Sequence, residues 1–275
     1  MIEKDYQYKV CTKCFTFNHA PFIEDAMNGF AMQETTFPVI TLVVDDASTD
    51  GEPEAIQNYL KEHFQEPYRE EETEYAHIIC ANHKINTYCN FVVFLLKYNH
   101  HSIKKSKLAY LKEWLDNAEY RAICEGDDYW TDPKKLQKQV MFLDENPDYG
   151  LCHTDFDKFS QLTGTMMTIE RNCVDGWVTK ELIKGSFFIA TLTVLIRTSS
   201  LYEADTSFTK EGFLMGDLPL WIELSRVTKI MCLPERMACY RVLQDSASHS
   251  SSRLKLALCQ LNVYEIRQYF IDKSS

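Results

Sequence analysis

Residues 123–130 read Ile-Cys-Glu-Gly-Asp-Asp-Tyr-Trp, an apolar run that leads directly into a cluster of carboxylates. The residues before the cluster, 121–124, have the pattern of the end of a buried strand. The residues after it predict the start of a helix, with Asp132 as the N-cap and Pro133 at the first helical position. The cluster therefore lies at the carboxyl end of a strand, where open α/β sheets bind their ligands.

The cluster places three acidic residues, Glu125, Asp127 and Asp128, within four positions. Their charges repel one another unless a cation or hydrogen-bond donors offset them. Ions such as Mg²⁺ are bound by one or two carboxylates together with phosphate oxygens, so the pattern indicates a metal–diphosphate site. The alternative is a polar turn that caps the next helix and binds nothing. This stretch alone favours neither interpretation.

A second acidic strand end lies at residues 43–51, which read Val-Val-Asp-Asp-Ala-Ser-Thr-Asp-Gly. The carboxylates of Asp45 and Asp46 could accept hydrogen bonds from a nucleobase N–H or from ribose hydroxyls. The alternative is an ordinary Asp/Ser/Thr turn that binds its own backbone. Two acidic strand ends in one α/β chain open onto the same edge of the sheet, which favours a shared ligand site.

Apolar runs alternate with amphipathic segments, which predicts a largely parallel sheet covered by helices. We expect strands at residues 8–17, 38–44, 75–81, 149–156, 187–197 and 230–240, and one that ends at 125. We expect helices at residues 22–32, 55–60, 90–98, 105–117, 133–145, 218–227 and 254–271. The acidic segment 66–74 and the serine-rich segment 246–252 are expected to be loops.

Composition excludes several classes of protein. The 275 residues are 45% hydrophobic and carry a net charge of −11, with a pI near 5.2, which argues against a binder of nucleic acid or anionic membranes. The first residues are polar, and the longest apolar run, 91–96, is too short to span a bilayer. The ten cysteines lie mostly in apolar segments, so we expect reduced thiols and a cytoplasmic protein. We expect no zinc or redox chemistry at the lone pair Cys11 and Cys14, and a surface position for His100 and His101.

Three segments occur in an order that resembles the inverting, family-two nucleotide-sugar glycosyltransferases, especially bacterial enzymes that build surface polysaccharides. They are Thr-Phe-Asn-His at 16–19, the segment 43–51, and Cys-Glu-Gly-Asp-Asp-Tyr-Trp-Thr-Asp-Pro at 124–133. The resemblance covers about residues 8–245 and is weak over 82–106. It implies the GT-A fold, a Rossmann-like α/β domain with a mixed, mainly parallel central sheet flanked by helices.

The resemblance implies transfer of a sugar from a nucleotide-diphosphate donor, with a UDP-sugar as the first expectation, to a saccharide or lipid-linked saccharide acceptor. A lipid-linked acceptor would bring the protein to the inner face of the membrane. Because the chain has no internal repeat or long linker, we expect one domain over residues 1–245. Within it, 1–130 would bind the donor and 131–245 the acceptor, while 246–275 would add a loop and a helix.

By the same resemblance, Phe17 and Asn18 touch the nucleotide, and the pair at residues 45 and 46 holds the base. Asp127 and Asp128 match the motif that binds ribose and the metal, Mg²⁺ or Mn²⁺, with Asp128 as the first choice of ligand. The family pattern is a strict Asp-x-Asp, whereas this chain has Glu-Gly-Asp-Asp. The departure leaves open which carboxylate touches the ion.

Residues 215–221, Met-Gly-Asp-Leu-Pro-Leu-Trp, match the segment that carries the catalytic base in the family, which implies that role for Asp217. The alternative is that Asp217 is only an N-cap, worth about 1 kcal/mol of stability. Relatives tend to place a histidine near the diphosphate where this chain has Leu243. Arg241 and His249 are the remaining candidates for the charge of the leaving group.

Two other functions are compatible with parts of this pattern. A sugar-phosphate nucleotidyltransferase could use a similar acidic site, but it usually has a glycine-rich, basic loop after the first strand, where this chain has Asn-His-Ala-Pro at 18–21. A non-catalytic sugar-nucleotide-binding protein is the other alternative, because Leu243 removes one expected diphosphate contact. The helix at 254–271 could dock a membrane or a second subunit, or pack on its own domain.

Overall fold

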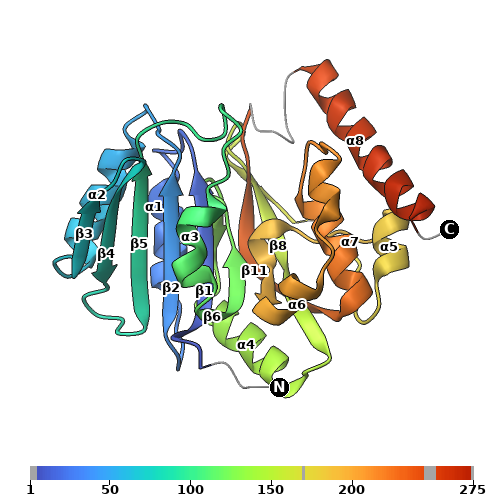
Figure 1. Cartoon of the computed structure of the whole chain (residues 1–275), viewed down its shortest axis with the longest axis horizontal. Helices are drawn as coiled ribbons and strands as arrows, with labels where there is room; N and C mark the ends of the chain where they lie inside the picture. The colour runs from blue at the N-terminus through green and yellow to red at the C-terminus, as the bar shows by residue number, and fades with distance from the viewer. Residues whose placement is uncertain (1–4, 169–170, 245–251, 274–275) are drawn as a thin grey trace. The chain divides into compact units, whose positions relative to one another are not determined.

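The structure is a computed structural model that describes residues 5–168, 171–244 and 252–273. The chain divides into two compact units, residues 1–141 and 142–275 (Figure 1). The boundary between the units falls within α4 (Lys135–Glu145). The final helix, which the sequence sets apart, belongs to the second unit.

The first unit contains a six-stranded run of sheet in the order β3-β4-β5-β2-β1-β6. β1, β2, β5 and β6 are parallel, and β3 and β4 extend the sheet in antiparallel pairing. The strand bounds are β1 (Tyr8–Thr16), β2 (Val39–Asp45), β3 (Arg69–Glu72), β4 (Ala76–Asn82), β5 (Cys89–Leu96) and β6 (Ala118–Ile123). Because the four parallel strands end at one edge, the loops that follow them lie close together.

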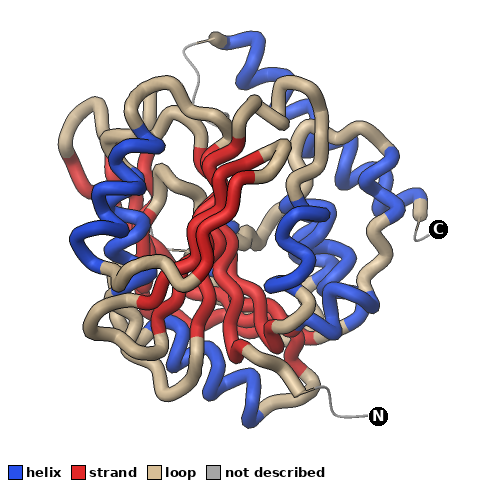
Figure 2. The backbone as a smooth tube through the Cα atoms, turned by 60° about the vertical axis from the view of Figure 1, so that its left-hand side comes forward, coloured by secondary structure: helices blue, strands red, loops and turns tan. Residues whose placement is uncertain are grey.

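Helices cover both faces of this sheet, with α1 (Ile23–Ala31) and α2 (Glu52–His63) on one face and α3 (Leu108–Leu115) on the other (Figures 1 and 2). Side chains of opposite parity in a strand point to opposite faces. In β5, Phe91 packs on Phe64, just beyond α2, with ring centroids 4.5 Å apart. Phe94 packs edge-on against Trp114 of α3 at 5.4 Å. Both faces of the sheet are therefore buried against helices.

The second unit is built around the long strand β8 (Tyr149–Ser160), which pairs in parallel with β11 (Lys229–Val242). β10 (Leu195–Arg197) and β9 (Thr165–Met167) pair with β8 in antiparallel orientation. The helices are α5 (Thr179–Lys184), α6 (Thr198–Glu203), α7 (Asp217–Val227) and α8 (Arg253–Asp272), with 3₁₀ turns η1 (Thr191–Thr193) and η2 (Ser207–Lys210). A two-residue strand, β7 (Tyr129–Trp130), lies in the first unit. The expected mixed α/β architecture with flanking helices is confirmed.

Three predicted elements are wrong or shortened. Residues 90–98 form strand β5 rather than a helix, because a short apolar run buried on both faces has no periodicity that separates the two. Part of the expected acidic loop 66–74 is the exposed edge strand β3, whose charged side chains keep the edge of the sheet solvated. In the expected strand 187–197, only the three residues of β10 pair with a neighbour, after the turn η1. The predicted loop 246–252 lies almost wholly outside the described residues.

The expectation of reduced cysteines is wrong for one pair. Cys173 and Cys232 form a disulfide, with Cα atoms 5.5 Å apart, and the two residues are 59 positions apart in sequence. The other eight cysteines are free, and Cys11 and Cys14 are among those buried in the sheet. Among the helices of the described residues, none combines the length and apolar character needed to cross a bilayer.

Candidate functional site

A buried glutamate connects the loops that follow β1 and β2. Glu52, the first residue of α2, has no exposed surface. Its carboxylate accepts hydrogen bonds from the His19 backbone N–H (2.9 Å), the Ser48 hydroxyl (2.8 Å) and the Thr16 hydroxyl. A buried carboxylate is tolerated only when donors surround it, so these contacts fix both loops. The sequence analysis did not identify Glu52. The one feature that could have indicated it is an acidic residue in the first turn of a predicted helix.

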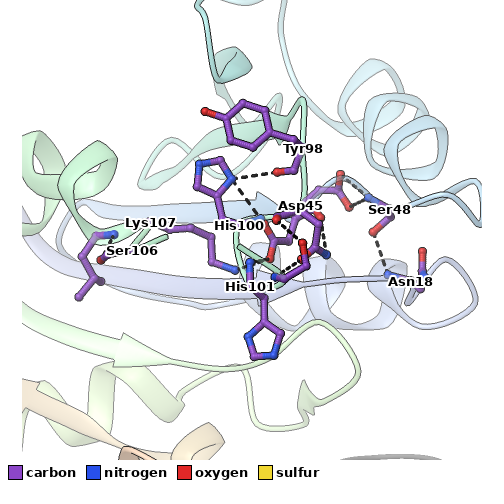
Figure 3. A network of polar contacts seen from close by, with 12 residues as sticks. Asn18, Asp45, Ser48, Tyr98, His100, His101, Ser106 and Lys107 are labelled. Atoms are coloured by element: carbon purple, nitrogen blue, oxygen red, sulfur yellow. Dashed lines mark hydrogen bonds and ion pairs between the residues drawn. The ribbon is translucent and has the colours of Figure 1, made fainter. Parts of the chain in front are cut away.

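Reciprocal bonds reinforce the connection between these two loops (Figure 3). Asn18 donates its backbone N–H to the Ser48 hydroxyl (2.8 Å), and its side-chain oxygen accepts from Thr49 N–H (2.9 Å). Asn18 has φ 55°, a left-handed conformation that asparagine tolerates better than most residues. Phe17 exposes 42% of its surface beside these contacts. The two residues expected to touch a nucleotide therefore belong to a fixed turn, with the aromatic ring open to solvent.

Asp45 and Asp46 are consecutive residues at the end of β2, so their side chains leave the strand on opposite sides. Asp45 is buried, and its carboxylate accepts from the Ser48 backbone N–H at 3.3 Å. Burial, reinforced by the charges of Glu52 and Asp46 and only partly offset by the bonds from Ser48, raises the pKa of Asp45 to about 6. At neutral pH, Asp45 therefore carries its charge in surroundings that favour the protonated form.

Asp46 is equally buried but well compensated. Its carboxylate accepts from the backbone N–H groups of His100 (2.8 Å) and His101 (3.1 Å) and pairs with Lys107 Nζ at 2.8 Å (Figure 3). Burial by itself would raise the pKa of Asp46, but these donors outweigh it and hold the pKa below its ordinary value. Two carboxylate oxygens have about four acceptor positions, so three donors leave room for about one more hydrogen bond.

His100 is fully buried, which corrects the prediction that it lies on the surface; the His101 side chain is exposed as expected. The His100 ring stacks on Tyr98 with centroids 4.6 Å apart. Its Nδ1 lies 2.9 Å from the Tyr98 carbonyl and its Nε2 lies 3.1 Å from the Tyr110 hydroxyl. Because a carbonyl only accepts, Nδ1 donates to the Tyr98 carbonyl. These contacts hold the loop between β5 and α3 against Asp46.

The acidic loop after β6 continues along β1. The backbone N–H of Gly126 donates to the Phe15 carbonyl at 3.1 Å, and a Cβ atom on Gly126 would come within 2.1 Å of the Thr16 hydroxyl oxygen, so only glycine fits. Asp127 and Asp128 follow directly. Asp128 is 3% exposed, whereas Asp127 exposes 18% of its side chain and places Oδ2 4.0 Å from His19 Nε2. The loops after β1, β2 and β6 therefore come together at one edge.

The residues of this edge fit a divalent ion of the Mg²⁺ type. In the described part of the chain, no group of three or more His, Cys, Asp or Glu side chains is placed to hold a metal by itself. Mg²⁺ is usually held by one or two carboxylates, with phosphate oxygens and waters completing its shell. The carboxylates of Asp127 and Asp128 are hard oxygen donors of this kind, so the chemistry of the pair suits an ion that binds together with a diphosphate.

The remaining predicted residues lie in the second unit. Asp217 is the first residue of α7 and Gly216 is the N-cap, so the structure does not place Asp217 at the N-cap position that was the alternative to its role as a base. Its carboxylate accepts from Leu218 N–H at 2.8 Å and from the Thr191 hydroxyl at 3.5 Å. Arg241, on β11, is 5% exposed and donates to the Gln161 side chain at 3.1 Å. His249 lies outside the described residues.

Relatives in sequence cover only part of the chain. No protein-family model matches it. Over 139 residues it is 36% identical to the uncharacterized proteins Mb1547 of Mycobacterium bovis and Rv1520 of Mycobacterium tuberculosis. The alignment covers 50% of this chain and 32% of each relative, so the chain matches about a third of their length.

Solved structures similar to the chain include glycosyltransferases. A fragment of S. aureus TarS in complex with UDP has a TM-score of 0.54 at 16% identity, covering 85% of this chain and 60% of that one. The mannosyltransferase PcManGT from Pyrobaculum calidifontis, in complex with GDP-Man and Mn²⁺, has a TM-score of 0.52 at 16% identity, covering 89% and 62%. The chain has a glycosyltransferase fold.

We predict that Lys107→Met lowers the free energy of unfolding by about 3 kcal/mol, because it leaves the buried Asp46 carboxylate without its counter-ion. Urea denaturation at pH 7 measures the change. The exposed Lys97–Glu72 pair is the control, and Lys97→Met should cost far less. Equal costs for the two variants would show that Asp46 does not depend on Lys107.

We predict that Asp45→Asn raises the free energy of unfolding by about 2 kcal/mol at pH 8 and changes it little at pH 4. The folded pKa of about 6 lies above the unfolded value. The native state therefore binds the extra proton, and wild-type stability falls as the pH rises from about 4 to 6. Denaturation curves across this range should show a weaker fall in the variant. The exposed Asp25→Asn is the control, and a parallel pH dependence in wild type and Asp45→Asn would refute the assignment.

Proposed function

We propose that the chain is an inverting glycosyltransferase of the GT-A type, which moves a sugar from a nucleotide-diphosphate donor to a saccharide or lipid-linked saccharide. The observation that carries the proposal is the meeting of the loops after β1, β2 and β6 in the first unit, with Asp127 4.0 Å from His19 of the turn that Asn18 begins. The fold supports it, since similar structures hold UDP or GDP-Man.

In this proposal, residues 1–130 bind the donor. Phe17 offers an exposed ring to the nucleoside, and Asn18 lies in the turn beside it. Asp46 is oriented by three donors and keeps about one acceptor position for a base N–H or a ribose hydroxyl. Asp45 holds the turn at Ser48, on the other side of β2. A site fixed before the ligand arrives loses little conformational freedom on binding.

Asp127 and Asp128 hold Mg²⁺ or Mn²⁺ in the proposed site, and Asp127 also binds ribose. When bound, the ion offsets the negative charge that develops on the departing diphosphate. Arg241 adds a second positive charge for the leaving group, in place of the histidine that Leu243 replaces.

Residues 131–245 bind the acceptor, and Asp217 is the catalytic base. Asp217 removes a proton from an acceptor hydroxyl, whose oxygen attacks the anomeric carbon as the bond to the diphosphate breaks, with inversion. The Thr191 hydroxyl is a long 3.5 Å from Asp217 Oδ2, so this oxygen retains capacity for the proton. By its resemblance, the enzyme works in the cytoplasm in bacterial surface-polysaccharide synthesis, and a lipid-linked acceptor would bring it to the inner face of the membrane.

We predict that one nucleoside diphosphate among UDP, GDP, dTDP, CDP and ADP raises the Tm of the wild type only when Mn²⁺ is present, with UDP as the first expectation. Asp128→Asn should abolish the shift, because it removes a charged ligand of the ion. Asp25→Asn removes the same charge from the exposed surface of α1 and should keep the shift. A panel with no shift at all, or an unchanged shift in Asp128→Asn, would contradict the donor site.

We predict that Asp217→Asn lowers transfer by about 10²- to 10⁴-fold, the usual contribution of a general base. The amide oxygen keeps the bond from Leu218 N–H, so folding and the nucleotide-dependent Tm shift should stay unchanged. Release of nucleoside diphosphate from the matching nucleotide sugar, with methyl glycosides as acceptors, measures the rate. Glu211→Gln, at an exposed position before α7, is the control. Wild-type rates in Asp217→Asn would assign the base elsewhere.

A further inference from the structure

A small cavity of about 50 Å³ lies wholly within the second unit. It is bounded by β8, the start of β11, residues 171–173 and residues 188–190. The Cys173–Cys232 disulfide forms part of its wall. One water molecule needs about 10–15 Å³ by this measure, so the cavity admits a small polar substituent but not a sugar ring.

Two buried polar groups at this cavity have no hydrogen-bond partner among the described residues. They are Nε2 of His153, a side chain in a residue that is 4% exposed, and Nη2 of Arg171. Burial lowers the pKa of His153 to about 4, although a backbone bond at Thr154 and the charge of Asp155 oppose it. A neutral imidazole nitrogen either donates or accepts, whereas a guanidinium only donates. A hydroxyl group can satisfy both atoms, because it donates and accepts.

The charges around the cavity cancel. Asp155 accepts from Arg171 Nη1 at 2.5 Å and pairs with Arg236 Nε at 3.3 Å. Arg236 Nε also lies 3.4 Å from Asp157. Two carboxylates therefore face two guanidinium groups among the described residues, which removes the attraction for an anion. The cavity suits a neutral, hydroxyl-bearing ligand.

An exposed aromatic residue lines the cavity, and a residue that follows its wall in sequence contacts the proposed base. Phe188 lines it and exposes 61% of its surface. The negative face of an aromatic ring attracts the positively polarised C–H groups of a sugar ring. Ala190 also lines the cavity, and the next residue, Thr191, donates its hydroxyl to Asp217. Two consecutive residues, Ala190 and Thr191, therefore connect the wall of the cavity to the carboxylate that would activate an acceptor.

We infer that this cavity and Phe188 form the binding subsite for the acceptor, a neutral saccharide. A hydroxyl-bearing substituent enters the cavity and binds His153 and Arg171, and the ring lies on Phe188. The inference rests on the proposed function, since it gives Asp217 its substrate. In this inference, His153, Arg171 and Phe188 bind the acceptor and take part in no chemical step.

Saturation-transfer NMR tests the subsite with methyl glycosides of glucose, galactose, mannose, N-acetylglucosamine and rhamnose, and with their octyl counterparts. At least one methyl glycoside should give a signal with the wild type. Phe188→Ala and Arg171→Gln should weaken that signal at least fivefold. Phe188 is exposed, so its truncation leaves the fold intact even where Arg171→Gln does not. Stronger signals from octyl forms that still depend on Phe188 would identify a lipid-linked acceptor; equal signals would identify a free saccharide.

Trp177→Ala is the matched control, because Trp177 is a 60% exposed aromatic residue of the same unit that does not line the cavity. The inference fails if no glycoside binds the wild type, if Phe188→Ala keeps the signal, or if Trp177→Ala loses as much. The nucleotide-dependent Tm shift reports on the first unit and should persist in Phe188→Ala. Loss of the subsite with that shift intact would leave the proposed function standing, whereas a wild type without the shift would overturn the function itself.

Discussion

Buried carboxylates must be surrounded by donors, and this constraint determines the edge of the first unit where the parallel strands end. Glu52 and Asp46 are almost completely buried there. Their donors come from loops that would otherwise be free: the turn after β1, the turn after β2 and the loop before α3. Each loop takes its position from a carboxylate, so charge that would destabilise a core instead arranges the candidate site.

The alternation of side chains in β2 extends this arrangement to both faces of the sheet. Asp45 is directed toward Ser48 and the start of α2, while Asp46 is directed toward Lys107 and α3. The two residues consequently have opposite electrostatic states, one with a raised pKa and one with a lowered pKa. Adjacent aspartates that look equivalent in sequence therefore have different contacts: Asp46 holds the loop before α3, and Asp45 holds the turn at Ser48.

The sequence predicted what depends on local pattern. The predicted strand ends at residues 44 and 125 lie within two residues of the observed ends at Asp45 and Ile123, most helices follow from apolar runs and turn residues, and the acidic loops do meet at one edge. The predictions from sequence were wrong where contacts between residues far apart in the chain determine the structure. His100 is buried because Asp46, 54 positions earlier, binds its backbone N–H. The Cys173–Cys232 disulfide joins residues 59 positions apart, and β5 is a strand because of its neighbours rather than its own periodicity.

The two units differ in how their buried polar groups are satisfied, and the difference has a consequence for recognition. In the first unit, protein donors already hold Glu52 and Asp46 in place, so a ligand at this edge would bind a preorganised surface. In the second unit, His153 and Arg171 each keep a buried atom without a partner among the described residues. A ligand that lacks the right hydroxyl would leave those atoms unpaired, and sites of this kind can reject such analogues by about 10⁴-fold or more. Discrimination among acceptors is therefore expected to depend on single hydroxyl groups.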